Sequence, residues 1–190
     1  MQIETERLIL REMNEEDFDD LYCVLADSDI MQHYPYTFDE KRVRGWIEKN
    51  QERYQIFGFG LWAVCLKENG KMIGDCGLTL QPIGNTIKPE IGYHIQKTYQ
   101  RKGYAKEAAI AVRDWAFTHT PFQTIYSYMK STNLPSMQTA QAYGCQRVDE
   151  FVDAVHFKLV FAENGTMTIL MKKTEESKTN KFHGIYTAVG

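Results

Sequence analysis

The sequence lacks several features that would assign it to common classes of protein. It has four cysteines in 190 residues and no C-x-x-C pair, and its five histidines show no metal-ligand spacing. We therefore expect buried free thiols, a reducing compartment and no metal site. No apolar run approaches the roughly 18 residues of a membrane span, and no signal-peptide pattern is present, so we expect a cytoplasmic protein.

The chain also has little net charge. Its 25 acidic and 22 basic residues give a formal charge of -3, and the basic residues are dispersed. This balance argues against nucleic acid or an anionic membrane as a partner. With 43% hydrophobic residues, the composition predicts one globular domain at residues 1–173, followed by a polar tail at 174–190.

What the sequence does contain is a strand, a short basic loop and a long helix in succession. Residues 90–95 alternate between polar and apolar types, which predicts a half-buried strand with its odd-numbered residues on one face. From residue 105 to about 118, apolar residues recur at three- and four-residue intervals, which is typical of a helix. Such a helix would direct its unpaired N–H groups and the positive end of its dipole at the loop.

This loop has the composition of an anion site. Gly103 allows the backbone to approach a phosphate closely, and Arg101 and Lys102 supply positive charge, although a solvated turn could have the same composition. No G-x-x-x-x-G-K-[ST], G-x-G-x-x-G or G-x-S-x-G occurs, nor a kinase-like set of motifs. Residues 100–105, QRKGYA, match the pattern Q/R-x-x-G-x-G/A. In that spelling the chain resembles the GNAT superfamily of acyl-CoA N-acyltransferases, whose loop of this pattern holds the pyrophosphate of coenzyme A.

The order of the expected elements supports the same resemblance. We expect strands at residues 3–11, 61–66, 71–80, 90–95, 122–129, 146–155 and 166–172, and helices at 15–26, 39–54, 105–118 and 134–143. Asn14, Thr37 and Asn133 are the expected N-caps, and residues 81–88 are expected to form a connection. This order resembles the GNAT fold over residues 3–173: an α/β (α+β) fold with a mixed, mostly antiparallel central sheet flanked by helices. Residues 6–11, 90–93, 103–108 and 133–136 resemble the branch that acetylates ribosomal-protein N-termini.

The resemblance implies an N-acetyltransferase that carries an acetyl group from acetyl-CoA to a primary amine by direct attack. The acceptor could be a protein N-terminus or a small-molecule amine. The expected oligomeric state is a monomer or a homodimer. The implied cofactor-binding residues are Gln100, Arg101, Lys102, Gly103, Tyr104 and Ala105 for the pyrophosphate, Tyr93, His94 and Ile95 along the pantetheine arm, and Asn133 and Ser136 beside it.

The reaction also needs a base and an acid. Glu90, at the beginning of the expected central strand, is the first candidate base, and a solvent-exposed strand-end charge is the alternative reading. His94 is the second candidate. Ser136 occupies the position where the resemblance implies a proton donor to the departing thiolate, although it could serve in helix capping alone. Much of the superfamily uses a tyrosine at the position of Ala140, so this departure disfavours a tyrosine acid.

Two other classes of function stay open on sequence grounds. A non-catalytic acyl-CoA-binding or sensing module would share the fold, and an unrelated α/β protein could carry the loop by chance. The acidic residues between 15 and 29 could form a cleft for a cationic acceptor or only a solvated face. For Glu107, beside the loop, we expect a structural role.

Overall fold

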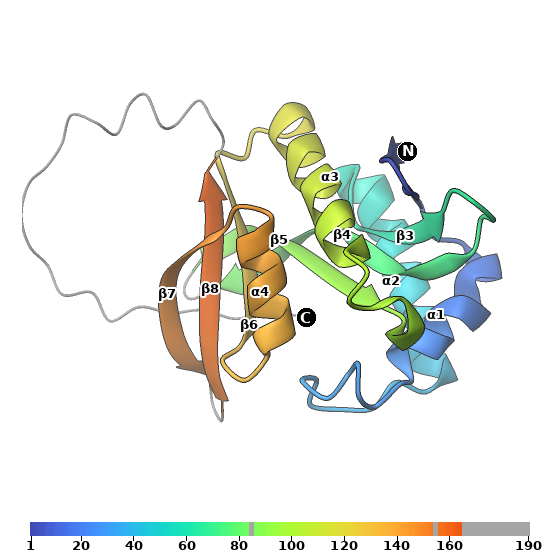
Figure 1. Ribbon diagram of the computed structural model, residues 1–190, viewed down its shortest axis with the longest axis horizontal. Coiled ribbons are helices and arrows are strands. Elements are labelled where there is room, and N and C mark those ends of the chain that lie inside the picture. Colours follow the sequence, from blue (N-terminus) through green and yellow to red (C-terminus); the bar gives the residue numbers. More distant parts are fainter. Residues whose placement is uncertain (84–85, 154–155, 165–190) are drawn as a thin grey trace, which may run out of the picture.

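The computed structural model describes residues 1–83, 86–153 and 156–164 and builds them around one eight-stranded sheet (Figure 1). The strands are β1 (Gln2–Glu4), β2 (Leu8–Arg11), β3 (Leu61–Leu66), β4 (Met72–Ile83), β5 (Thr86–Ile95), β6 (Thr124–Lys130), β7 (Gln146–Asp153) and β8 (His156–Asn164). They lie in the order β1-β2-β3-β4-β5-β6-β8-β7, and only β5 and β6 run parallel as neighbours. The expected mixed, mostly antiparallel sheet is confirmed.

Helices cover both faces of this sheet. They are α1 (Phe18–Leu25), α2 (Glu40–Phe57), α3 (Tyr104–His119) and α4 (Leu134–Ala142), with 3-10 turns η1 (Glu15–Asp17) and η2 (Lys97–Tyr99). The apolar stripe of α3 packs on the face that carries the odd-numbered residues of β5, as the alternation predicts. The apolar residues of α1 and α2 pack on the opposite face, and Figure 1 shows α3 in front of β4 and β5 with α2 behind them.

The sheet divides where β5 meets β6. These parallel neighbours are in register at one pair, Glu90 with Tyr126. The Ser127 hydroxyl also donates to the carbonyl of Ile91 at 3.1 Å. Beyond this point, among the described strands, only β4 pairs with the end of β5 at residues 92–95. One edge of that segment is therefore open to a ligand.

Several expected boundaries are wrong. Residues 3–11 form two antiparallel strands, because the Thr5 N–H donates to the Leu8 carbonyl and turns the chain. Residues 81–88 belong mostly to a long hairpin, in which ten registered pairs between β4 and β5 outweigh the proline signals. Asp39, not Thr37, caps α2 by accepting from the Arg42 N–H. The strand β8 at His156–Asn164 was not predicted. The strand expected at residues 166–172 lies outside the described residues.

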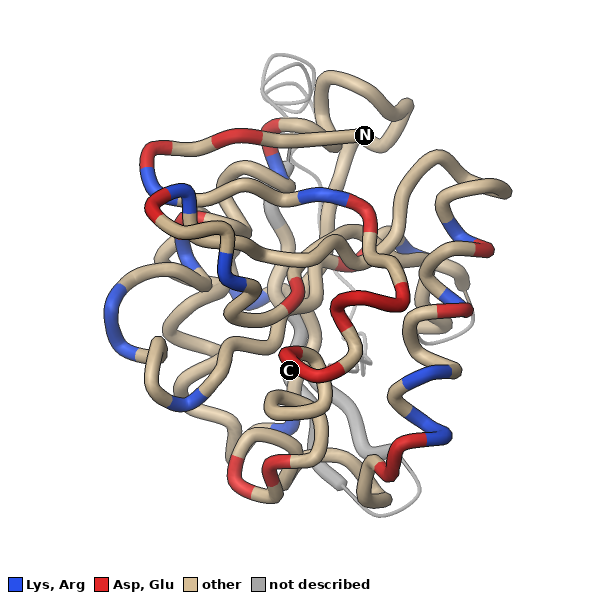
Figure 2. The backbone as a smooth tube through the Cα atoms, turned by 90° about the vertical axis from the view of Figure 1, so that its right-hand side faces the viewer, with Lys and Arg blue, Asp and Glu red and all other residues tan. Residues whose placement is uncertain are grey.

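The N-caps at Asn14 and Asn133 and the ends of α3 agree with the sequence predictions. Of the four thiols, Cys23 is exposed, contrary to expectation, while the other three are buried. No helix in the described ranges is long and apolar enough to cross a membrane. Within those ranges no group of His, Cys, Asp or Glu could hold a metal ion. Acidic and basic residues interleave along the backbone (Figure 2).

Candidate active site

A cavity of about 470 Å³ opens beside the unpaired end of β5. Its walls come from that strand end, the loop before α3, the first turn of α3, α4, and residues 29–33 of the irregular segment after α1. Among the residues expected to bind a cofactor, those that line it are Tyr93, His94, Ile95, Gln100, Arg101, Gly103, Tyr104, Ala105, Asn133 and Ser136. The structure therefore brings together two segments that lie about thirty positions apart in the sequence.

The loop directs the start of α3 at this cavity. Gly103 is the N-cap residue and has φ of 86°, in the left-handed region that favours glycine. Arg101 is also left-handed, with φ of 61°. The Gln100 side chain donates from Nε2 to the carbonyl of Ile95 at 2.9 Å, which fixes the loop against the end of β5. The unpaired N–H groups of the first turn of α3 are thus placed at one end of the cavity.

Glu107 braces the loop from behind, as expected. Its carboxylate accepts from the Thr5 hydroxyl at 2.6 Å and from the backbone N–H and the side chain of Arg7. Arg7 in turn donates from Nη1 to the Lys102 carbonyl at 3.0 Å. Burial opposes ionisation of Glu107, but the hydrogen bonds from Thr5 and Arg7 outweigh it and lower the pKa of the carboxyl. The N-terminal hairpin therefore supports the anion loop.

One basic residue of the expected set does not line the cavity. The side chain of Lys102 does not line the cavity; its ammonium lies 5.2 Å from the centroid of the Tyr99 ring. Lys106, which the sequence prediction missed, lines the cavity instead. Lys106 stands three residues after Gly103 in the first turn of α3, and this helical spacing is the signal that could have identified it.

Ser136 lies in the wall formed by α4 and is buried, with 5% of its surface exposed. Its backbone N–H donates to Oδ1 of Asn133 at 3.1 Å, which caps α4. Its hydroxyl is 3.1 Å from the hydroxyl of Tyr93, which also donates to the Ser136 carbonyl at 2.9 Å. The cap of α4 therefore uses the backbone N–H of Ser136 and does not involve its hydroxyl.

A second cavity of about 350 Å³ lies on the α2 side of β5. Its lining residues include Tyr34, Tyr36 and Phe38 from the irregular segment 27–38, Trp46 and Arg53 from α2, and Glu90 and His94 from β5. The sequence predicted the position of Glu90 and His94 in the strand, but not the contribution of Trp46 and Arg53 from α2. His94 lines both cavities, so the two cavities are adjacent at this residue.

Glu90 is buried in the middle of β5, with 1% of its surface exposed, which contradicts its reading as a charge at the strand end. Oε2 accepts from the Thr79 hydroxyl at 3.1 Å, while Oε1 has no hydrogen-bond partner among the described residues. Burial raises the pKa of this carboxyl to about 8, although the Thr79 hydrogen bond and the charge of Arg53 oppose the shift. A carboxyl of this pKa can accept and return a proton near neutral pH.

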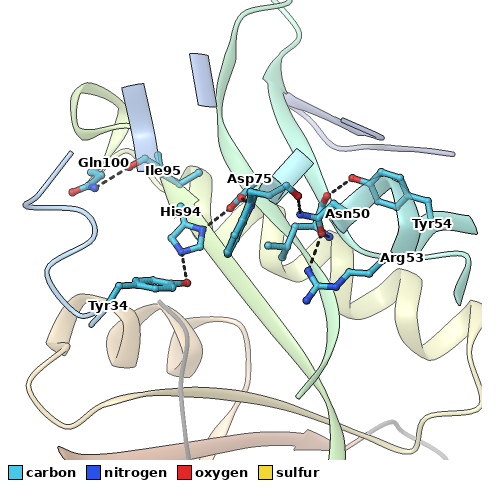
Figure 3. A network of polar contacts seen from close by, with 10 residues as sticks. Tyr34, Asn50, Arg53, Tyr54, Asp75, His94, Ile95 and Gln100 are labelled. Atoms are coloured by element: carbon cyan, nitrogen blue, oxygen red, sulfur yellow. Dashed lines mark hydrogen bonds and ion pairs between the residues drawn. The ribbon is translucent and has the colours of Figure 1, made fainter. Parts of the chain in front are cut away.

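His94 belongs to a buried polar chain that includes Asp75 and Tyr34 (Figure 3). Its Nδ1 lies 2.7 Å from Oδ1 of Asp75, whose Oδ2 accepts from Nε1 of Trp46 at 2.9 Å. Its Nε2 lies 3.0 Å from the hydroxyl of Tyr34. Burial raises the pKa of Tyr34 well above its ordinary value, so Tyr34 keeps its proton and donates to Nε2. Asp75 and Tyr34 thereby fix the orientation of the imidazole ring from its two sides.

These two cavities provide complementary chemistry on opposite sides of one strand. The first offers helix N–H groups, basic side chains and an open strand edge, which suit a phosphorylated ligand with amide groups. The second offers a buried carboxyl of raised pKa, which suits proton removal from a nucleophile. A ligand in each cavity would meet the other beside His94.

Comparison with known proteins identifies the family of the chain. The family model for the acetyltransferase (GNAT) domain matches residues 7–146. The chain is 33% identical over 141 residues to the uncharacterized protein YkkB of Bacillus subtilis, covering 74% of this chain and 82% of that protein. It is similar to a crystal structure of an acetyltransferase from Agrobacterium tumefaciens, with a TM-score of 0.76 and 27% identity over 87% of this chain and 95% of that chain.

The RimL ribosomal L7/L12 alpha-N-protein acetyltransferase, solved in complex with coenzyme A, shares the fold. Its TM-score is 0.72 at 18% identity, covering 86% of this chain and 98% of that chain. The match of the family model over most of the described chain, together with the 33% identical relative, decides the assignment. The protein belongs to the GNAT acetyltransferase family.

Proposed function

We propose that the protein transfers an acetyl group from acetyl-CoA to a primary amine by direct attack of the amine on the thioester. The observation that carries this proposal is the adjacency of the two cavities at His94, with the anion loop in one and the buried Glu90 in the other. Acetyl-CoA is the general acetyl donor of the family, and the fold neighbour RimL was solved with coenzyme A.

In this proposal the first cavity holds the cofactor. The pyrophosphate binds the N–H groups of residues 101–105, with positive charge from Arg101 and Lys106. The pantetheine arm runs along the open edge of β5 at residues 93–95, where backbone groups pair with its amides. Oδ1 of Asn133 is occupied by the cap of α4, so its NH₂ group is the donor available to the arm.

The second cavity holds the amine. Glu90 accepts a proton from the amine, directly or through water, as the nitrogen attacks the thioester carbonyl. A backbone N–H of β5 polarises that carbonyl. The C–S bond then breaks, and the hydroxyl of Ser136 donates to the departing thiolate. Both ring nitrogens of His94 are engaged, Nδ1 with Asp75 and Nε2 with Tyr34, which favours a positioning role for this ring over that of the first base.

Thiol release from acetyl-CoA, measured against a panel of amines, tests the proposed function. We expect saturable release that depends on both acetyl-CoA and one class of amine, with free CoA as a competitive inhibitor. Binding of acetyl-CoA without turnover on any amine would favour the non-catalytic sensing module. Absence of acetyl-CoA binding in a titration would refute the proposal.

Replacing Ser136 with alanine should separate its hydroxyl from its capping role. We expect kcat to fall about 10- to 100-fold, because the thiolate loses a hydrogen-bond donor, while the Kd for acetyl-CoA changes less than about threefold. The cap of α4 should survive, since it uses the backbone N–H of residue 136. Tyr93→Phe tests the same contact from the other side, because it removes the hydroxyl that bonds the hydroxyl and the carbonyl of Ser136. An unchanged kcat in Ser136→Ala would exclude Ser136 as the acid.

A further inference from the structure

The second cavity has a positive lining in a protein whose formal charge is -3. Arg42, Lys49 and Arg53 line it from one face of α2, at positions separated by two turns and then one turn. None of the three forms an ion pair with a described residue, and Glu90 is the one acidic residue in the lining. The acidic residues between 15 and 29 do not line this cavity.

Arg53 is half-buried, and most of its hydrogen-bond donors are not engaged by described residues. In the part of the chain that the structure describes, its side chain makes one hydrogen bond, from Nη1 to Oδ1 of Asn50 at 3.0 Å (Figure 3). Its Nε and Nη2 groups make no hydrogen bond to a described residue. Burial lowers the pKa of Arg53, while the charge of Glu90 opposes this effect. A guanidinium with free donors in a cavity wall is suited to binding a carboxylate in a bidentate manner.

The rest of the lining is aromatic. Tyr34, Tyr36, Phe38 and Trp46 form a series of ring contacts, with centroids 5.4 Å apart for Tyr36 and Phe38 and 5.6 Å apart for Phe38 and Trp46. These rings provide an apolar surface between the basic side chains of α2 and the polar pair Glu90 and His94. The volume of about 350 Å³ is at the lower end of the range for small-molecule sites.

We propose that the acceptor is a small amine that carries a carboxylate, namely an amino acid with an apolar or aromatic side chain. Arg53 and Lys49 bind its carboxylate, the aromatic rings contact its side chain, and its amine is presented to Glu90. This inference rests on the proposed function for the identity of the reaction. Polyamines and aminoglycosides bring positive charge to three cations, and a protein N-terminus offers an amide in place of the carboxylate, so both are disfavoured.

The test compares matched amines that differ only at the carboxylate. L-phenylalanine, L-leucine, L-methionine and L-tryptophan are each measured against their amides and decarboxylated amines, and the amides also mimic a peptide N-terminus. Both thiol release with acetyl-CoA and calorimetric binding to the CoA-loaded protein are recorded. For at least one amino acid, we expect the free acid to have a kcat/KM at least tenfold higher, and a Kd at least tenfold lower, than its two neutral counterparts.

The Arg53→Gln variant should reduce the ratio of kcat/KM for acid over amide to below about threefold. The ratio is the proper readout, because loss of Arg53 also alters the charge near Glu90 and would change the rate with every amine equally. The fold should survive, since Oδ1 of Asn50 still accepts from the Leu61 N–H at 2.9 Å. Lys49→Gln should lower the ratio to a smaller extent.

Arg44→Gln is the matched control, because Arg44 lies on α2 outside the cavity and pairs with Glu15. Equal binding and turnover of acids and amides, or an unchanged ratio in Arg53→Gln, would overturn the acceptor assignment and leave acetyl transfer intact. Failure of all four acids to bind would also overturn it. Selective binding of an acid without thiol release would support the assignment of the cavity and refute acetyl transfer instead.

Discussion

Gly103→Glu is expected to weaken acetyl-CoA binding at least about 100-fold. The substitution places a carboxylate at the N-cap of α3, where the proposed site binds a pyrophosphate. Two like charges 4 Å apart repel by about 4 kcal/mol at an effective dielectric constant of 20, which corresponds to roughly a thousandfold in Kd. The left-handed backbone, with φ of 86°, adds strain for any residue that has a side chain. Isothermal titration with acetyl-CoA measures the effect.

Two controls separate the charge from the strain in this experiment. Gly70→Glu introduces the same residue at a φ of 75°, in open space at a turn that lines neither cavity, and should leave Kd unchanged within about twofold. Gly103→Ala introduces the backbone strain at the left-handed φ but no charge, and it should weaken acetyl-CoA binding less than about tenfold. Normal affinity in Gly103→Glu, with the protein still folded by circular dichroism, would remove the anion loop from the proposed site.

The first cavity could be predicted from the sequence because its signals are local. The glycine and basic residues stand within one hexapeptide before a periodic helix, and Asn133 and Ser136 stand at the start of another. Lys102 lies outside the lining of the cavity and Lys106 lies in it, and the sequence did not distinguish the two. The composition shows that the loop carries positive charge. Which basic side chain faces the cavity depends on its position around the helix, which the composition does not give.

The second cavity could not be read from the sequence in the same way. Asp75 meets His94 because the two residues are directly paired across the hairpin of β4 and β5, which depends on a register that the sequence did not specify. Trp46 and Arg53 reach the cavity only because α2 packs across the sheet. Contacts between distant segments carry no spacing signal, so this part of the site required the structure.

Glu90→Gln should reduce kcat/KM for the amine about 100- to 10,000-fold, while the Kd for acetyl-CoA stays within about twofold. Glutamine keeps the size of the side chain and can still accept from the Thr79 hydroxyl, but it cannot take the proton. Because burial raises the pKa of Glu90 to about 8, ionisation of Glu90 should make kcat/KM of the wild type rise about tenfold per pH unit below 8 and level off above it, and titration of the amine adds to this profile. Stopped-flow thiol release between pH 6 and 10 gives both profiles.

The residual activity of Glu90→Gln should depend on pH only through the titration of the amine. The change of slope near pH 8 in the profile of kcat/KM should therefore disappear. Glu52→Gln makes the same change of charge at an exposed position of α2 and should keep the wild-type profile. A limb near pH 8 that persists in Glu90→Gln would transfer the role of base to another group, and His94 would then be the next candidate.

Stability measurements can show that this loss of activity does not arise from unfolding. The folded-state pKa of Glu90 is raised from 4.5 to about 8, so native Glu90 keeps its proton at pH values where the unfolded chain has lost it. Its contribution to stability is therefore complete below about pH 4.5 and is lost as the pH rises to 8, at up to about 1.4 kcal/mol per pH unit. Glutamine does not ionise, so Glu90→Gln should unfold at a higher temperature than the wild type at pH 9. A less stable variant at pH 9 would contradict the assignment of Glu90 as a buried carboxyl of raised pKa.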